Sequence, residues 1–581
     1  MAADGAMQTS YRVRDVMESP LNRDVGWAAG ADRATTVGAD LPFRIRFEVE
    51  AADDAAIGAR EGGGFRLQVR RNGGVWEDLV ARDFPYPDEI STPPVSIVEA
   101  RGYAGGEATA DLLSGSELPF EEGVGVSLDS AAPAWSATSA AQGEWEWPLV
   151  IRRYADGAVT NDEGDTFDFR MRTAAGAPVA SASAFARVRL AVPERLLGGT
   201  FVETPGRLGP WQSSDGDLHF VMEPAETDNV LMAVRSPDGG RSWAEVDGVA
   251  RPTTGDLEGV ATGWHEGRVH ILHQISDSVL YHIFRTADTP EGAGWEVRDE
   301  FVAAPGEPPV QVAALELLPD GRAVAVYGGP MDLRIRVRSP DGPWGDEALI
   351  RGQSDERVSG PQTVLLPGGE VALAYTTQTV LPGEEDEGVG AKVADDPNPD
   401  VEGRAWLSMI DPAGSPGPPL LVSNRIGARE EESGAFAPLV YLADTQEVLV
   451  LYREADGHLW ERRRGPGGSL TAPVRATRRP VVQNAVDSDQ VGADAVVHEG
   501  VVHLLFIDDA TRAIHHTRRL PNGEWTGDEV VVQEIDGQWV RGAIVRGSGG
   551  EPAYAFVYDA GSQGGSGMNR YGELPLGSSV R

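Results

Sequence analysis

Four side chains in the last two-thirds of the chain have the chemistry needed to hold a sugar. Trp264, Tyr452 and Trp460 offer aromatic faces that can stack on sugar rings, and the guanidinium of Arg285 can form paired hydrogen bonds with a carboxylate. All four flank turns between predicted strands, where side chains reach the surface. We therefore take Trp264, Arg285, Tyr452 and Trp460 as candidate glycan-binding residues.

One short segment is rich in arginine, with Arg462, Arg463, Arg464, Arg475, Arg478 and Arg479. A guanidinium matches a carboxylate in shape and charge, so this cluster could meet an anionic sugar or an acidic neighbouring subunit. A rim of arginines paired with surface carboxylates would give the same pattern. Both interpretations stay open at this point.

All ten histidines follow residue 218, and His219, His270 and His503 occupy one position in three repeats, which predicts a shared packing role. The spacing from His265 to His270 differs from the helical H-E-x-x-H motif, so we predict no zinc site. The segment Asp395–Asp400 carries oxygen ligands but lacks the glycine and final glutamate of an EF-hand loop. We expect no cofactor, and calcium is the one metal left open.

Composition narrows the functional class. The chain has 90 acidic and 50 basic residues, a net charge of −40, and no cysteine. Such a surface repels phosphate backbones, which disfavours nucleic-acid binding, and the lack of cysteine excludes thiol chemistry. Residues 1–10 lack the features of a secretory signal and no apolar run is long enough to span a membrane. We expect a protein made in the cytoplasm, without membrane insertion.

From about residue 195 the chain repeats a strand, a glycine-containing turn and a second strand, usually at intervals near 50 residues. The closest pair, 265–272 and 498–505, shares six of eight residues. Repeats of this length with several strands per unit are typical of a β-propeller. We predict a propeller over residues 193–581, with seven blades favoured and six if the last segment only closes the ring.

The first third of the chain has a different pattern. Period-two alternation, as in Phe43–Val49 and Phe65–Val69, predicts an antiparallel β-sandwich over residues 19–192. Residues 1–18 are expected to form a polar N-terminal arm. The predicted fold class is all-β, a sandwich followed by a propeller.

The residues Ser236, Asp238, Gly240, Ser242 and Trp243 fit S-x-D-x-G-x-[ST]-W, the Asp box that closes a hairpin in propeller blades. We expect a structural role, because Asp238 can accept backbone N–H groups while Trp243 packs between strands. The motif and the repeats resemble the sialidase-type propellers.

Active sialidases carry an arginine in an F/Y-R-I-P motif at the first blade. The corresponding place here reads Arg207-Leu-Gly-Pro210, a broken version, and the remaining catalytic residues of that family have no counterpart that we can place. Tyr558 and Tyr571 lie late in the chain, where a tyrosine nucleophile would be sought, but without a supporting context. We therefore assign no catalytic residue and favour a protein that is not an enzyme.

The segments Phe120–Gly125, Glu144–Leu149 and Asp162–Arg170 resemble sandwich domains of phage and gene transfer agent head-spike fibres. This resemblance implies a virion protein that docks on a capsid or spike-base protein, forms a homo-oligomer and binds host surface polysaccharide with its propeller. A sialidase-like glycosidase or polysaccharide depolymerase is the first alternative. A purely structural virion protein is the second.

Overall fold

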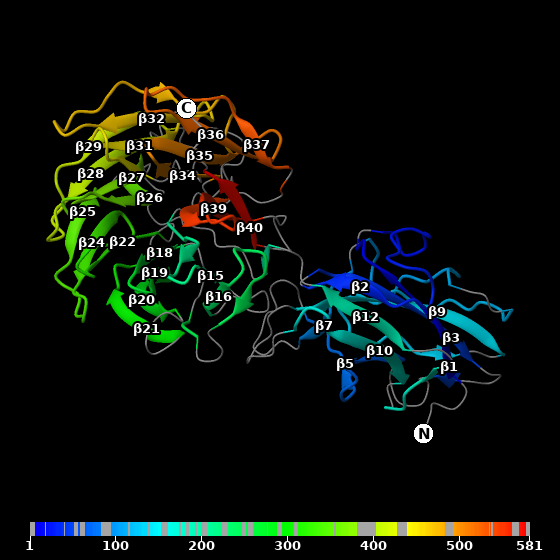
Figure 1. The fold of residues 1–581 in the computed structure, drawn as a ribbon. Coiled ribbons are helices and arrows are strands. Elements are labelled where there is room, and N and C mark those ends of the chain that lie inside the picture. The colour runs from blue at the N-terminus through cyan, green and yellow to red at the C-terminus, as the bar shows by residue number, and fades with distance from the viewer. Residues whose placement is uncertain are drawn as a thin grey trace. The chain divides into compact units, whose positions relative to one another are not determined.

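The computed structural model describes residues 6–576, with short gaps and longer gaps at 83–93, 153–160, 199–205, 223–229, 380–402, 427–438, 483–491 and 560–568. The chain divides into two compact units, one of Met1–Glu194 with Pro224–Thr227 and one of Arg195–Glu223 with Asp228–Arg581. Both are built from β-strands (Figure 1). Within the described residues, no helix is long and apolar enough to cross a membrane.

The N-terminal unit contains two five-stranded sheets. The first has the order β11 (Ala180–Ser181), β1 (Ala6–Arg14), β3 (Phe43–Ala51), β9 (Ala141–Ile151) and β7 (Val95–Ile97). The second has the order β2 (Thr35–Gly38), β12 (Ala186–Ala191), β10 (Thr166–Thr173), β5 (Phe65–Arg71) and β6 (Glu77–Asp78). A short pair, β4 (Ala56–Ile57) and β8 (Trp135–Ser136), lies beside them.

Alternate residues of these strands form one apolar core. In β3 and β9, Phe43 pairs with Leu149 and Phe47 with Trp145, and each of these side chains is buried. Phe169 of the second sheet packs edge-on against Phe43, with ring centroids 6.3 Å apart. The two sheets therefore pack face to face as a sandwich.

Residues 6–14 do not form the expected polar arm. They form β1, which is hydrogen-bonded to β3 on one side and β11 on the other. Tyr11 and Val13 lie in the core, while Arg14 on the opposite face is also fully buried. The prediction was wrong because the polar residues of this strand have buried partners that a single sequence does not reveal.

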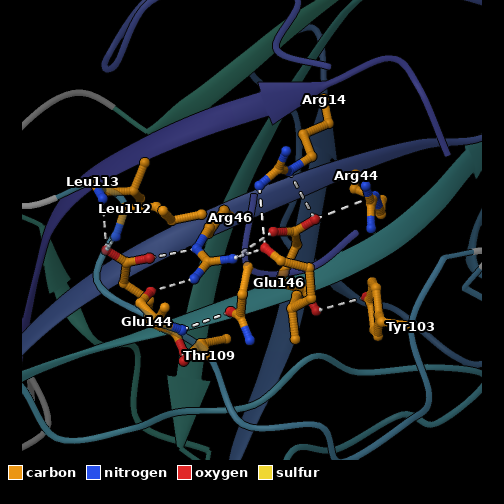
Figure 2. A network of polar contacts seen from close by, with 12 residues as sticks. Arg14, Arg44, Arg46, Tyr103, Thr109, Leu112, Leu113, Glu144 and Glu146 are labelled. Carbon is orange, nitrogen blue, oxygen red and sulfur yellow. Dashed lines mark hydrogen bonds and ion pairs between the residues drawn. The ribbon is translucent and has the colours of Figure 1, made fainter. Parts of the chain in front are cut away.

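The face of the first sheet directed away from the core carries a buried ionic network (Figure 2). Glu146 of β9 pairs with Arg14 of β1 at 3.2 Å and, on β3, with Arg44 at 3.2 Å and Arg46 at 2.9 Å. Arg46 also pairs with Glu144 of β9. Three guanidiniums and two carboxylates thus share one buried cluster, where each charge depends on its partners because water is excluded.

The same guanidiniums hold the segments that cover this face. Arg44 donates a hydrogen bond to the carbonyl oxygen of Ser19 (2.7 Å), and Arg46 donates to those of Leu21 (2.9 Å) and Ala110 (2.5 Å). The network therefore joins three neighbouring strands to two loop segments. The N-terminal unit therefore has two buried regions: the apolar core between its sheets and this ionic network on the other face of the first sheet.

Seven four-stranded sheets make up the second unit in the described part of the chain (Figure 1). Blade 1 contains β14 (Trp211–Gln212), β15 (Leu218–Met222), β16 (Met232–Ser236) and β17 (Ala244–Glu245); blade 2 contains β18 (Gly259–His265), β19 (Arg268–Ile275), β20 (Ser278–Arg285) and β21 (Gly294–Ala303). Blade 3 contains β22 (Ala313–Leu317), β23 (Ala323–Gly328), β24 (Asp332–Arg338) and β25 (Ala348–Gly352); blade 4 contains β26 (Glu356–Leu365), β27 (Val371–Thr379), β28 (Gly403–Ile410) and β29 (Leu420–Ile426). Blade 5 contains β30 (Val440–Leu442), β31 (Glu447–Arg453), β32 (Leu459–Arg464) and β33 (Val474–Arg475); blade 6 contains β34 (Ala493–His498), β35 (Val501–Ile507), β36 (Ile514–Arg519) and β37 (Glu529–Val532).

The last blade closes the ring. Blade 7 contains β38 (Val540–Arg546), β39 (Pro552–Asp559) and β40 (Asn569–Pro575), and its outermost strand is β13 (Leu196–Gly198) from the beginning of the unit. The first strand of blade 7 also contacts the first strand of blade 1. The described residues thus form a seven-bladed β-propeller, which confirms the predicted fold class.

The repeated turns explain why the pattern could be read from the sequence. In blade 2, Glu266 and Gly267 both have positive φ, and Glu499 and Gly500 repeat this in blade 6. A two-residue turn in which both residues have positive φ matches the right-handed twist of the two strands that it joins. Each glutamate–glycine pair therefore joins the first two strands of its blade.

Candidate functional site

A cavity of about 340 Å³ lies where the first strands of blades 1, 4, 5, 6 and 7 meet. Blades 1 and 4 stand on opposite sides of a seven-bladed ring, so the cavity lies on the propeller axis. Its wall includes two aromatic residues, one arginine and one acid among apolar side chains: Trp211, Tyr441, Arg207, Asp494, Val364, Val440 and Ile544.

The acid at this wall is part of a buried polar group. Asp494 of β34 is 2% exposed and accepts a hydrogen bond from the hydroxyl of Tyr554 at 2.6 Å. Burial raises the pKa of the Asp494 carboxyl to about 6, and the Tyr554 hydrogen bond and the charge of Arg541 oppose this rise. Arg541 itself donates to the carbonyl oxygens of Val540 (2.7 Å) and Gly206 (3.1 Å). Asp494 is therefore a carboxyl group that can hold a proton in mildly acidic solution.

The charge of Arg207 acts on this acid and on a second one. Its guanidinium is half-buried, donates to the carbonyl oxygen of Thr363 at 3.5 Å, and lowers the pKa of both Asp494 and Glu316. Burial outweighs that effect and raises the pKa of the Glu316 carboxyl of β22. Oε2 of Glu316 is buried and has no hydrogen-bond partner among the described residues. Two carboxyls with raised pKa values, one in the cavity wall and one outside it, are thus within range of the charge of one arginine.

The chemistry of the cavity suits a small polar ligand with an apolar face. Its volume falls in the range of about 300–1,000 Å³ found for small-molecule sites. Trp211 and Tyr441 are half-buried, so part of each ring faces the cavity. Arg207 supplies N–H donors and Asp494 a carboxyl group. An aromatic wall beside such polar groups can bind a sugar ring.

Two of the candidate residues chosen from the sequence lie in blade 2. Trp264 is half-buried on β18 and stacks on His219 with ring centroids 6.5 Å apart. Arg285 ends β20, and its Nε lies 3.7 Å from a carboxylate oxygen of Glu296. Both side chains therefore already have neighbours within the propeller.

The other two candidates lie in blade 5. Tyr452 of β31 is 1% exposed, so its ring is not available to stack on a ligand. Trp460 of β32 is half-buried, and its indole N–H lies 3.3 Å from Oδ1 of Asp456. Blades 2 and 5 are not neighbours in the ring, and the cavity wall includes none of the four candidates. The structure does not bring these residues together.

The residues of the predicted Asp box form one hydrogen-bonded turn after β16. Oδ1 of Asp238 accepts the hydroxyl of Ser236 (2.9 Å) and the backbone N–H of Ser242 (2.9 Å), and Oδ2 accepts the Ser242 hydroxyl (2.6 Å). The backbone N–H of Gly240 donates to the Ser236 hydroxyl at 2.8 Å. Trp243 is buried and donates to the carbonyl oxygen of Gly240. These contacts hold a turn together.

The three repeated histidines are all buried. Burial lowers the pKa of His270 to about 3 and that of His503 to about 4, so both rings are neutral at physiological pH. His219 stacks beside a tryptophan, which fits a packing role. In the part of the chain that the structure describes, no three acidic or histidine side chains are placed to hold a metal ion. The segment Asp395–Asp400, considered for calcium, lies outside the described residues.

The sequence reasoning noted Arg207 but missed Glu316, Asp494, Tyr554 and Arg541. These residues come from blades 3, 6 and 7, and ring closure brings Glu316, Asp494 and Tyr554 within range of the Arg207 charge. One signal was present: Glu316 is the single acid in an otherwise apolar first strand, and Asp494 is the single acid in a first strand that is apolar up to its last residue, His498. An isolated carboxyl in such a strand is unusual unless it has a partner or a function.

No protein family and no curated protein matches the sequence. Among solved structures, the chain is similar to the lectin BP39L from Burkholderia pseudomallei, with 12% identity over 66% of this chain and 99% of the lectin and a TM-score of 0.43. It is also similar to a polysaccharide lyase described as an ulvan lyase, with 9% identity over 66% of this chain and 95% of the lyase and a TM-score of 0.42. A variant of the Aleuria aurantia lectin shares 10% identity over 58% of this chain and all of the lectin, with a TM-score of 0.32. At these identities, the likeness concerns the fold.

Proposed function

We propose that the propeller binds a polysaccharide and that the central cavity holds one of its sugar residues. The observation that carries this proposal is the combination of Trp211 and Tyr441 with Arg207 around one cavity. Among the described residues, the Arg207 guanidinium makes a single hydrogen bond, the 3.5 Å contact to Thr363. Its remaining donors are free for sugar hydroxyls or a carboxylate.

The test is a glycan array followed by calorimetry with the oligosaccharide that binds best. Trp211→Ala and Arg207→Ala are each expected to weaken binding about tenfold or more, because each removes roughly 1–2 kcal/mol of ligand contact. Trp406→Ala is the matched control. Both indoles donate to a threonine hydroxyl, Trp211 to Thr262 (2.8 Å) and Trp406 to Thr377 (2.9 Å), but Trp406 is not part of the cavity wall.

An array on which the wild-type protein binds no glycan would contradict the proposal. Equal losses for Trp211→Ala and Trp406→Ala would also contradict it, because a general effect on the propeller would then explain both. Circular dichroism and thermal unfolding of each variant establish that the ring is intact before binding is compared.

We extend the proposal to the N-terminal unit as the anchor of a virion head spike or fibre in a phage or gene-transfer-agent-like particle. The support is the resemblance of its sequence motifs and its separate core. In this arrangement the unit docks on a capsid or spike-base protein as a homo-oligomer, and several weak glycan contacts on one particle add up. Electron microscopy of particles made with and without this chain tests it: loss of a projecting density supports the anchor, and unchanged particles contradict it.

A glycosidase or depolymerase is the second candidate function, favoured by the two carboxyls near Arg207. A hydrolase of this kind needs one carboxyl to donate a proton and a second to assist the attack. Asp494 fits the first task because burial raises its pKa to about 6. Release of reducing ends from a bound polysaccharide by the wild-type protein, lost in Asp494→Asn, would establish this activity; binding without release would leave the propeller as a lectin.

A further inference from the structure

A second cavity, of about 570 Å³, lies away from the propeller axis, between blades 5 and 6. One wall is β33 with the residues that follow it, and the other is the turn that joins β36 to β37. The lining side chains that matter here are Arg475, Thr477, Arg478, Glu524, Trp525 and Thr526. We call this the rim cavity.

The rim cavity contains two arginines of the cluster noted in the sequence. Other members of that cluster are neutralised: Arg463 pairs with a carboxylate at 2.9 Å and Arg479 with another at 2.8 Å. Arg475 and Arg478 are exposed, and neither forms an ion pair with a carboxylate among the described residues. The rim cavity therefore has available positive charge on a protein whose net charge is −40.

The donors of Arg475 are partly preoriented. Its Nε donates to the carbonyl oxygen of Thr477 at 3.0 Å, and Nη2 lies 2.7 Å from Nδ1 of His458. The backbone N–H of Arg478 donates to the Asp528 carboxyl. Burial raises the pKa of this carboxyl, and the charge of Arg478 opposes part of the rise. These contacts position the main chain and one guanidinium edge, while the Arg478 guanidinium is exposed to solvent.

Trp525 is held in place by a clamp between the two blades. Glu461 of blade 5 accepts the Trp525 indole N–H at 3.0 Å and the Nε of Arg519 at 2.7 Å. Trp344, Arg338 and Glu300 form the same arrangement between blades 2 and 3, with distances of 2.8 and 2.7 Å. The clamp fixes the orientation of the Trp525 ring in the wall of the rim cavity. A ligand therefore does not have to order this side chain when it binds.

We propose that the rim cavity binds an acidic sugar of a polysaccharide, with its ring against Trp525 and its carboxylate between Arg475 and Arg478. A fixed aromatic ring suits the apolar face of a sugar, and paired guanidiniums suit a carboxylate. Glu524 and Thr526 supply an acceptor and a hydroxyl for the sugar's own hydroxyl groups. This site is separate from the central cavity and does not depend on it.

The experiment uses the full chain and three probes of equal length: hexagalacturonate, the neutral maltohexaose, and hexaglutamate. Calorimetry at low salt is expected to show hexagalacturonate binding at least about tenfold tighter than either other probe, since a charge-assisted hydrogen bond is roughly twice as strong as a neutral one. The Arg475→Ala/Arg478→Ala double variant is expected to lose this preference. Raising the salt concentration is expected to weaken the preference of the wild-type protein for hexagalacturonate, because salt screens exposed charges.

Two controls separate charge and fold from recognition. Arg241→Ala removes an exposed arginine on the β16–β17 turn and is expected to leave binding unchanged. Trp525→Ala is expected to weaken binding, whereas Trp344→Ala, which breaks the equivalent clamp, is not. Arg475 and Arg478 are exposed, so replacing them should not affect folding, and the arginine variants still decide the test if a tryptophan variant fails to fold.

Equal affinity of the double variant and the wild type for hexagalacturonate would overturn the proposal, and so would the absence of measurable uronate binding. Equal binding of hexaglutamate would overturn it as well, because the cavity would then be a general anion patch. Loss of uronate binding in Trp211→Ala, a change in the central cavity, would place the acidic sugar there instead. Failure of the central site alone would leave the rim result intact.

Discussion

Replacing Glu146 with glutamine should strongly destabilise the N-terminal unit. Its carboxylate is shared by Arg14, Arg44 and Arg46, and all four side chains have 0% exposure. Glutamine keeps the volume and one acceptor, so the change removes charge rather than packing. Of the three buried guanidiniums, Arg46 would keep a carboxylate partner in Glu144, while Arg14 and Arg44 would lose the carboxylate with which they pair.

The expected loss can be estimated from this geometry. Removing one partner of a buried ion pair costs about 3–5 kcal/mol, because the other charge is left without compensation and away from water. Glu146 serves three partners, so we expect a loss at or above the upper end of that range. A domain of this kind has a total stability of about 5–15 kcal/mol, so the variant loses a third of it or more.

Hydrogen exchange by mass spectrometry measures the effect in the full chain, because peptides from β1, β3 and β9 report the N-terminal unit separately from the propeller. Asp24→Asn is the control. It removes a pair with Arg12 at 3.2 Å in which the Asp24 side chain is 69% exposed, and it should cost about 0–1 kcal/mol. If Glu146→Gln cost no more than Asp24→Asn, the reasoning would be refuted, and apolar packing alone would hold β1 in the sheet.

Two further predictions concern the propeller. Gly240→Ala should lower its melting temperature, with a loss of about 2 kcal/mol or more, because Gly240 has φ +84° and an added Cβ would overlap the Tyr571 ring. Gly465→Ala, with no positive φ and open space around it, should be close to neutral, and equal effects would contradict the explanation. Lowering the pH from about 6.5 toward 3 should destabilise the propeller. Burial lowers the folded-state pKa of His270, His282 and His516 to about 3. The unfolded chain takes up protons on these residues near pH 6.5, so acid favours the unfolded state. Calorimetry at pH 7 and pH 5.5 should lower the propeller transition but not that of the N-terminal unit, because residues 1–194 contain no histidine and burial raises the pKa of Glu48 and Glu144 there. An equal loss of stability in both units would count against this explanation.

The architecture was largely predictable because local chemistry repeats with the fold. Each glutamate–glycine turn, such as Glu266-Gly267, marks the first hairpin of a blade by its own backbone preference. Strand β1 was not predictable in the same way. Arg14 of that strand is buried on the face opposite the apolar core. A buried arginine needs a carboxylate partner, and this one, Glu146, lies more than a hundred residues further along the chain.

The central site escaped prediction for a related reason. Arg207, Glu316, Asp494 and Tyr554 lie on different blades, and their proximity depends on ring closure rather than on spacing in the sequence. Aromatic type and position near a turn were weaker guides. Tyr452 met both criteria yet belongs to the second strand of its blade, where side chains face neighbouring blades.

Strand β13, which completes blade 7, follows the N-terminal unit in the sequence and is held by few hydrogen bonds. Only Leu196–Gly198 pair with β40, and the adjoining Arg195 bonds through its backbone to Arg241 and Tyr571. A force transmitted along the chain from residue 194 would act on these few hydrogen bonds directly. Breaking the β13–β40 pairing would remove the outermost strand of blade 7 and open the ring at the blade where it closes.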